Sequence, residues 1–268
     1  MNKVEIIGLG AWSPTFADWS SFCTGLRRGE WSTDGALQPE RIPPRERRRA
    51  PQLVKMAIEV MDQACTMADM SPDDVAVVFS SAMGDMQITD YMCRALSQTP
   101  KLISPTKFHN SVHNAAPGYW SITTGSFAPG TAVSAYEHTA SMAFLEAAIQ
   151  VVEENTPVVL VMQEVAAPLS LLDTCPSEQA FSAAVLMTPP GFSDSAACTL
   201  AFSVTEGAGD WPALDSRLSP GLATNYGARL LPLLTAIADG ERSAEFNFPV
   251  TEFVSLSLAL VSNRAASG

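Results

Sequence analysis

Hydrophobic residues follow two periods along the first two thirds of the chain, and these periods predict alternating strands and helices. Continuous apolar runs at residues 4–9, 75–79 and 157–163 are typical of strands that are buried on both faces. Between them, residues 52–68 place apolar side chains at helical spacing and predict a long amphipathic helix. This alternation predicts an α/β fold with a mostly parallel sheet covered by helices on both faces.

The pattern changes after about residue 170, where turn-rich loops separate shorter elements. The predicted elements there are strands at 181–187 and 198–204, a helix at 228–238, and one or two strands within 246–261. No repeat, low-complexity block or convincing linker divides the chain, so residues 1–268 are predicted to form a single domain.

The central stretch, residues 108–155, has the most informative order of elements. Small and apolar residues predict a helix over 112–124, a short strand over 131–135 and an amphipathic helix over 140–152. A strand that runs directly into a helix exposes its junction at the carboxyl edge of a sheet, where α/β proteins place nucleophiles and ligands. The junction here reads Tyr136-Glu137-His138-Thr139.

Composition adds four expectations. Hydrophobic residues make up 47% of the chain and charged residues only 16%, which predicts that some surface is covered by a partner. The net charge of −12 argues against nucleic-acid binding. Without a long apolar run or a signal-peptide pattern, we expect a cytoplasmic protein that does not span a membrane. The five scattered cysteines, without CxxC spacing, are interpreted as buried thiols of a reducing compartment.

Motifs for cofactors are missing from the sequence. There is no phosphate-binding loop, dinucleotide fingerprint or clustered Cys/His set, so neither a cofactor nor a metal site is predicted. The three histidines, His109, His113 and His138, all lie in the central stretch. His109 and His113 would share one face if a helix covered both. A structural polar role for this pair is favoured over a catalytic one.

Basic residues gather near the N-terminal end. Seven of the 16 basic residues lie between Arg27 and Arg49. Such a run is most often a solvated loop ahead of a helix. On an acidic chain it also allows a docking patch for an acidic partner.

Several segments, in this order, resemble β-ketoacyl synthases. They are the opening KVEIIGLGAWSP, the helix DWSSFCTGLRRGE, the unit QLVKMAIEVMDQACTMADMSPDDVAVVFSSAMGD, the central stretch through its strand–helix junction, and PVVLVMQEVAAPLS, where Glu164 lies near a glutamate typical of the family. The resemblance covers about residues 3–170. It implies a thiolase-like fold, acyl-chain chemistry on an acyl carrier protein, and a strongly reduced C-terminal half at residues 171–268.

Two departures from that family bear on activity. Its condensing enzymes hold the acyl chain on a cysteine at the strand–helix junction, and that position falls on Thr139, beside Glu137 and His138. No cysteine lies between Cys93 and Cys175, and the family's two C-terminal histidines have no counterpart after His138. A threonine hydroxyl is a poor substitute for a thiolate. We therefore expect no catalytic residue and no condensation by this chain alone.

The resemblance then points to a chain-length-factor-like subunit, as found in aryl polyene biosynthesis, that forms a heterodimer with an active β-ketoacyl–acyl carrier protein synthase. In that family the strand before the junction pairs across a two-fold axis, which implies an interface at Thr131, Val133 and Ala135. The preceding helix lines the acyl tunnel or the interface, which carries over to Phe108, His109, His113, Tyr119 and Trp120. Ordinary core packing is the alternative for Phe108, Tyr119 and Trp120. Acyl carrier protein is a further candidate partner.

Two other functions stay open. One is a hydrolase or acyltransferase that uses Thr139 or Ser141 as nucleophile and His138 as base. The other is a purely structural subunit of an assembly, without contact to an acyl chain.

Overall fold

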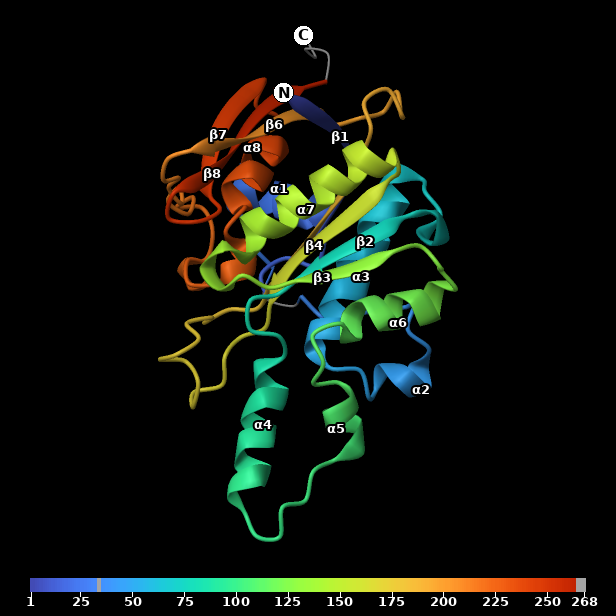
Figure 1. Ribbon diagram of the computed structural model, residues 1–268, viewed down its shortest axis with the longest axis vertical. Coiled ribbons are helices and arrows are strands. Elements are labelled where there is room, and N and C mark those ends of the chain that lie inside the picture. The colour runs from blue at the N-terminus through green and yellow to red at the C-terminus, as the bar shows by residue number, and fades with distance from the viewer. Residues whose placement is uncertain (33–34, 264–268) are drawn as a thin grey trace.

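The computed structural model describes residues 1–32 and 35–263. Through these residues runs a mixed sheet with the strand order β3-β2-β4-β5-β1-β6-β8-β7 (Figure 1). The strands are β1 (Asn2–Trp12), β2 (Ala76–Ser80), β3 (Gly130–Val133), β4 (Val158–Glu164), β5 (Phe181–Thr188), β6 (Cys198–Glu206), β7 (Ser243–Pro249) and β8 (Val254–Ser262).

Helices cover both faces of this sheet. They are α1 (Trp19–Arg28), α2 (Pro44–Arg47), α3 (Gln52–Ala68), α4 (Met86–Ser97), α5 (Pro105–His109), α6 (Ala115–Thr124), α7 (Thr139–Glu154) and α8 (Leu231–Asp239), with 3₁₀ turns η1 (Pro72–Asp74), η2 (Tyr136–His138), η3 (Pro220–Leu222) and η4 (Tyr226–Ala228). Helices α1, α7 and α8 pack on one face, and α3 and α6 pack on the other. Helices α4 and α5 extend away from the sheet (Figure 1).

The prediction of a mostly parallel sheet is wrong. Strand β2 pairs in parallel with β3 and with β4, but the other neighbouring pairs are antiparallel. The error has a physical cause, because antiparallel strands buried on both faces show the same continuous apolar runs as parallel ones. The segment between β4 and β5 contains no helix, so these strands run in opposite directions. The predicted α/β class with helices on both faces is confirmed.

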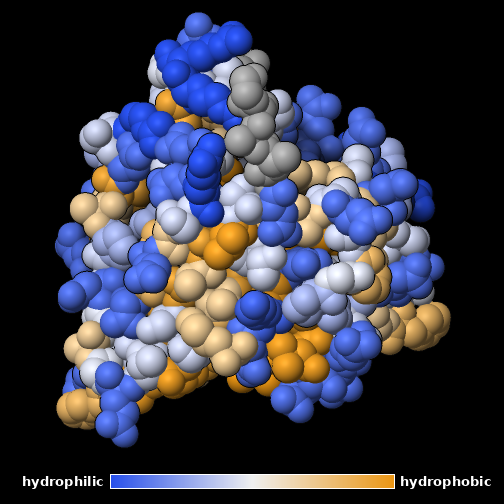
Figure 2. Space-filling view, turned by 90° about the horizontal axis from the view of Figure 1, so that it is seen from above, coloured by the Kyte–Doolittle hydropathy of each residue, from blue (hydrophilic) through white to orange (hydrophobic). Residues whose placement is uncertain are grey.

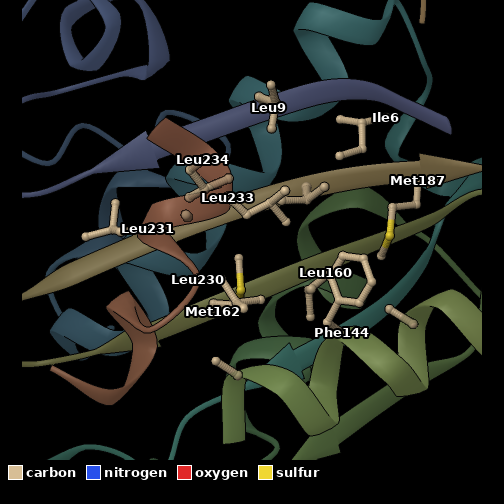
Figure 3. Packing of buried hydrophobic residues seen from close by; sticks show 14 of the residues in the cluster. Ile6, Leu9, Phe144, Leu160, Met162, Met187, Leu230, Leu231, Leu233 and Leu234 are labelled. Atoms are coloured by element: carbon tan, nitrogen blue, oxygen red, sulfur yellow. The ribbon is translucent and has the colours of Figure 1, made fainter. Parts of the chain in front are cut away.

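Each central strand contributes to two separate cores. Along β4, Val158, Leu160 and Met162 pack with α7, whereas Val159 and Val161 pack against the opposite face with α3. This alternation follows from the two-residue period of a strand. Figure 3 shows the first core, where leucines at the start of α8 and a phenylalanine of α7 meet β4 and β5.

Helix α3 lies directly on β1, and two glycines permit this contact. A Cβ atom at Gly8 would overlap the backbone carbonyl of Ala64, and one at Gly10 would overlap that of Val60. Strand β1 also shifts register between Ile6 and Gly8 where it pairs with β5. The glycines therefore let the backbones of strand and helix approach each other closely.

Helix α6 begins later than predicted. It starts at Ala115 instead of residue 112, because turns occupy the preceding residues. His109 ends α5 and His113 lies in a turn, so no single helix carries both histidines. The condition under which they would share a helical face is therefore not met.

Hydrophobic side chains also reach the surface. Figure 2 views the molecule from the end where both termini lie, and apolar patches appear there between polar residues. Within the described residues, no helix is long and apolar enough to cross a membrane.

Candidate functional site

The parallel strands β3, β2 and β4 end side by side, so their carboxyl ends meet along one end of the sheet. Ser80 lies opposite Val133 on one side and opposite Met162 on the other. The loop after β2, the junction between β3 and α7, and Glu164 at the end of β4 therefore meet at this carboxyl edge. This is the place where open α/β sheets hold ligands and reacting groups.

Glu164 is fully buried beneath the loop that follows β2. Its carboxyl group accepts hydrogen bonds from the hydroxyl of Ser81 (3.1 Å), from the backbone N–H of Met83 (3.4 Å) and from that of Ala82. Burial raises the pKa of Glu164 to about 8, and the hydrogen bonds oppose this shift only in part. The carboxyl group therefore holds the loop by hydrogen bonds, and none of the described ion pairs includes it.

His113 supports the same loop from the other side. Its Nε2 atom donates to the backbone carbonyl of Ser81 at 2.7 Å, and its ring meets the ring of Phe79 edge-on. These contacts agree with the structural role that was favoured for His113.

The junction between β3 and α7 is a sharp turn. Tyr136 has a φ of +51°, a left-handed conformation that is uncommon for residues other than glycine. Thr139 is almost fully buried, and its hydroxyl donates to the carbonyl of Tyr136 (2.7 Å) while it accepts from the N–H of Ala135 (2.8 Å). The hydroxyl thus closes the turn and is already fully engaged.

Neither candidate hydroxyl is paired with a histidine nitrogen in the described structure. The hydroxyl of Ser141 is buried and donates to the carbonyls of His138 (3.0 Å) and Pro249. Nδ1 of His138 is buried without a hydrogen-bond partner, and Nε2 lies 3.8 Å from the carboxylate of Glu137. A nucleophile needs its base within hydrogen-bond reach, so this arrangement does not favour hydrolysis or acyl transfer.

The predicted tunnel residues occupy three different environments. Phe108 and His109 are exposed on α5, Tyr119 is half-buried, and Trp120 is buried in the core between α3 and α6. Core packing, the alternative left open by the sequence, therefore describes Trp120 but not Phe108. A cavity of about 710 Å³ lies between α5 and α6, and the predicted residues His109 and Tyr119 line it.

Strand β3 forms an outer edge of the sheet, since β2 is its neighbour on one side alone. The predicted interface residues Thr131 and Val133 lie on it, and Ala135 follows it. Two strongly exposed residues that were not predicted from the sequence lie on α6 and in the turn before β3: Ile122 (77%) and Phe127 (102%). Phe127 stands in a glycine- and proline-rich turn, where no periodic pattern marks it.

Of the seven basic residues from Arg27 to Arg49, the five from Arg41 onward divide into two groups. Arg41 pairs with Asp62, and the guanidinium group of Arg47 donates to backbone carbonyls within its own loop. In contrast, the exposed Arg45, Arg48 and Arg49 together line a surface hollow of about 400 Å³. Part of the run is therefore structural, and part of it is exposed positive charge.

None of the five cysteines forms a disulfide. The prediction that all five thiols are buried holds for Cys65 and Cys198, whereas Cys23 and Cys175 are half-buried and Cys93 is exposed on α4.

The model of the β-ketoacyl synthase N-terminal domain matches residues 19–247 of the sequence. The chain belongs to this family. No curated protein matches the chain. The resemblance inferred from the motifs is therefore confirmed at the level of the family.

Solved structures of β-ketoacyl synthases have the same fold. A ketosynthase (ApeO) in complex with its chain length factor (ApeC) from Xenorhabdus doucetiae matches with a TM-score of 0.67 and 17% identity, over 97% of this chain and 100% of that chain. The complex of AntDE with the type II acyl carrier protein AntF matches with a TM-score of 0.75 and 15% identity, over 98% and 100%. A β-ketoacyl synthase from Burkholderia phymatum STM815 matches with a TM-score of 0.72 and 9% identity, over 98% and 100%. At these identities the likeness confirms the thiolase-like fold.

The buried carboxyl group of this β-ketoacyl synthase-like domain predicts a pH-dependent stability. The pKa of Glu164 rises from an ordinary value of 4.5 to about 8 in the folded chain, so between these values the folded state retains a proton that the unfolded state has lost. This contribution to stability is complete below pH 4.5 and is lost as the pH rises to about 8, with a slope of at most ~1.4 kcal/mol per pH unit. Glu164→Gln should flatten this part of the profile when unfolding by urea is followed from pH 5 to 9.

The exposed Glu178 provides the control, because Glu178→Gln should leave the wild-type profile unchanged. Identical slopes for wild type and Glu164→Gln would show that another group titrates.

Proposed function

We propose that this chain is a non-catalytic, chain-length-factor-like subunit. It would form a heterodimer with an active β-ketoacyl–acyl carrier protein synthase and help to shape the acyl tunnel of that enzyme in type II polyketide, aryl polyene or fatty acid biosynthesis. The observation that carries this proposal is the open edge of β3, which lies among exposed hydrophobic side chains.

Exposed apolar side chains on α5, on α6 and in the connection that leads into β3 suit a protein partner. Phe108, Val112, Ile122 and Phe127 are each more than half exposed, and of the two helices it is α6 that contacts β3. Large apolar patches favour association because a partner removes them from water, and open sheet edges favour it because their unpaired backbone N–H and C=O groups can pair with another strand. A strand added by a partner would complete the backbone hydrogen bonds of β3. The similar ApeO–ApeC structure, a ketosynthase with its chain length factor, supports this type of partner.

A lack of catalytic groups at the junction supports the non-catalytic role. The turn contains no cysteine, and the hydroxyl of Thr139 is engaged by Ala135 and Tyr136. No histidine follows His138 in the sequence. The junction has the shape of a nucleophile turn but offers neither a thiolate nor a hydroxyl with an adjacent base.

The cavity between α5 and α6 is the proposed place for an influence on chain length. Tyr119 and Ile122, which line it, are both on α6, the helix that leads to the open edge of the sheet. A growing acyl chain cannot enter a close-packed interior without a loss of packing energy. Side chains that fill this cavity can therefore limit the length of the product.

The exposed arginines suit acyl carrier protein as a second partner, provided that the carrier is acidic. Arg45, Arg48 and Arg49 present positive charge on a chain whose net charge is −12. Opposite charge steers association and fixes orientation more than it adds affinity. A purely structural subunit remains the second candidate, since the same open edge and apolar surface would serve it equally.

Mutations at the exposed apolar surface should weaken the heterodimer. Ile122→Asp combined with Phe127→Asp places two charges on side chains that are exposed in the isolated chain, so the fold itself should tolerate them. We expect the affinity for the synthase to fall more than about tenfold, which corresponds to ~1.4 kcal/mol of binding free energy. The affinity is measured by bio-layer interferometry with the purified synthase. Phe253→Asp is the matched control, because Phe253 is 75% exposed in the β7–β8 connection at the opposite end of the sheet. Full affinity of the double variant would place the interface elsewhere.

Removal of the junction hydroxyl should not abolish condensation. Thr139→Ala deletes two hydrogen bonds and should cost about 1 kcal/mol each in stability, while turnover per intact heterodimer stays within roughly threefold of wild type. Turnover is followed by CO₂ release from malonyl thioester. A loss of about a thousandfold with an intact complex would identify Thr139 as a catalytic residue.

Enlargement of the α5–α6 cavity should lengthen the product. Tyr119→Ala removes a half-buried ring from the cavity wall, and mass spectrometry of the products of reconstituted complexes should then show longer chains. Tyr119→Phe, which keeps the ring, serves as the control. A lower yield with an unchanged length distribution would indicate a weakened interface and would favour the structural subunit.

A further inference from the structure

A second, smaller cavity of about 250 Å³ lies where residues 211–214, η3, η4 and the start of α8 meet. Apolar side chains such as Pro212, Leu214, Leu222 and Pro232 line it together with a substantial polar surface to which Asn225 and Arg229 belong. Ligand pockets for drug-sized molecules occupy about 300–1,000 Å³, so this cavity is suited to a smaller compound.

Arg229 brings a positive charge to this cavity without a carboxylate partner. It is half-buried, and no acidic side chain forms an ion pair with it in the part of the chain that the structure describes. Its guanidinium carbon lies 5.5 Å from the ring centre of Trp211 and 5.7 Å from that of Tyr226. Nε is buried and has no hydrogen-bond partner. Cation–π contacts offset only part of the cost of leaving a buried donor unpaired.

A second unpaired donor belongs to the same cavity. The indole Nε1 of Trp211 is buried and also has no hydrogen-bond partner, and its ring packs against Phe248 at 5.7 Å between centres. Asn225, another lining residue, is fully used by the fold, because it donates to the carbonyl of Gln179 (2.8 Å) and accepts from the N–H of Ala228 (3.1 Å). The unpaired donors are thus confined to Arg229 and Trp211 among the polar groups of this wall.

We propose that this cavity binds a small organic carboxylate, with the carboxylate on Arg229 and Trp211 and an apolar body against the proline and leucine side chains. A guanidinium group presents parallel N–H donors that match the two oxygens of a carboxylate. The proline and leucine side chains in the wall favour an acyl or aryl body over a fully hydrated inorganic anion. The net charge of −12 repels anions at long range, so binding must depend on the local positive charge of Arg229. Salt screens distant charges, and a change in them should therefore weaken binding little.

This site is separate from the features that support the heterodimer. Tyr226 connects it to the junction through a ring contact with Tyr136 (5.1 Å between centres), but Thr139 and the α5–α6 cavity do not contribute to its lining. The inference therefore stands independently of the proposed chain-length role.

Benzoate is a suitable probe, because it combines a carboxylate with a small apolar ring. The full chain, alone or with its synthase, is labelled with ¹⁵N-tryptophan, and the indole N–H signal of Trp211 is identified as the one that Trp211→Phe lacks. We expect benzoate to shift this signal saturably. Benzamide, its neutral counterpart, should bind at least tenfold more weakly, and inorganic phosphate should do the same.

Arg229→Gln should weaken benzoate binding at least tenfold. Arg94→Gln is the control, because Arg94 is an exposed arginine on α4 that pairs with Asp90. The proposal is wrong if wild type shows no saturable shift, if benzamide or phosphate binds as tightly as benzoate, or if folded Arg229→Gln binds like wild type. Should Arg229→Gln fail to fold, the comparison of benzoate with benzamide in wild type decides the question alone.

Discussion

The unpaired outer edge of β3 is the structural feature on which the proposed association with a synthase depends. This strand is short and stands at the end of the sheet, so within residues 1–32 and 35–263 the backbone groups on its outer side pair with no strand. Thr131, Ala132 and Val133 on this strand are half-buried, and the turn that leads into it exposes the large apolar side chain of Phe127. On its inner side β3 pairs with β2, and α6 and α7 contact β3. The position of the outer edge is therefore set by the buried sheet and by these two helices.

At the carboxyl ends of the same strands, hydrogen bonds within the chain engage the hydroxyls of Thr139 and Ser141 and hold the turn in one shape. Tyr136 holds a left-handed backbone, Thr139 closes the turn, and Glu164 fixes the neighbouring loop from within. Rigid placement of these loops is sufficient to present a surface or a tunnel wall to a partner, whereas catalysis would also require a nucleophile with its base. The chemistry of a complex would then reside in the synthase, and this chain would contribute shape.

Periodicity in the sequence predicted those elements that carry a complete apolar pattern within their own residues. Helix α3 has the predicted bounds, Gln52–Ala68, because its apolar stripe is complete. The direction of the strands was missed, since β4 and β5 are buried on both faces and leave no polar alternation to mark antiparallel pairing. The burial of Trp120 depends on contacts between distant segments, and no local pattern separates a core tryptophan from one that lines a tunnel. Phe127 was missed because its glycine- and proline-rich turn has no periodic pattern.

Native mass spectrometry of the untagged chain, co-expressed with a synthase encoded beside it, tests the central claim most directly. The open edge of β3 and its apolar surroundings predict a one-to-one heterodimer that survives purification at moderate salt, with the chain alone forming aggregates or weak homodimers. A stable, soluble monomer that does not associate with the co-expressed synthase would contradict the account.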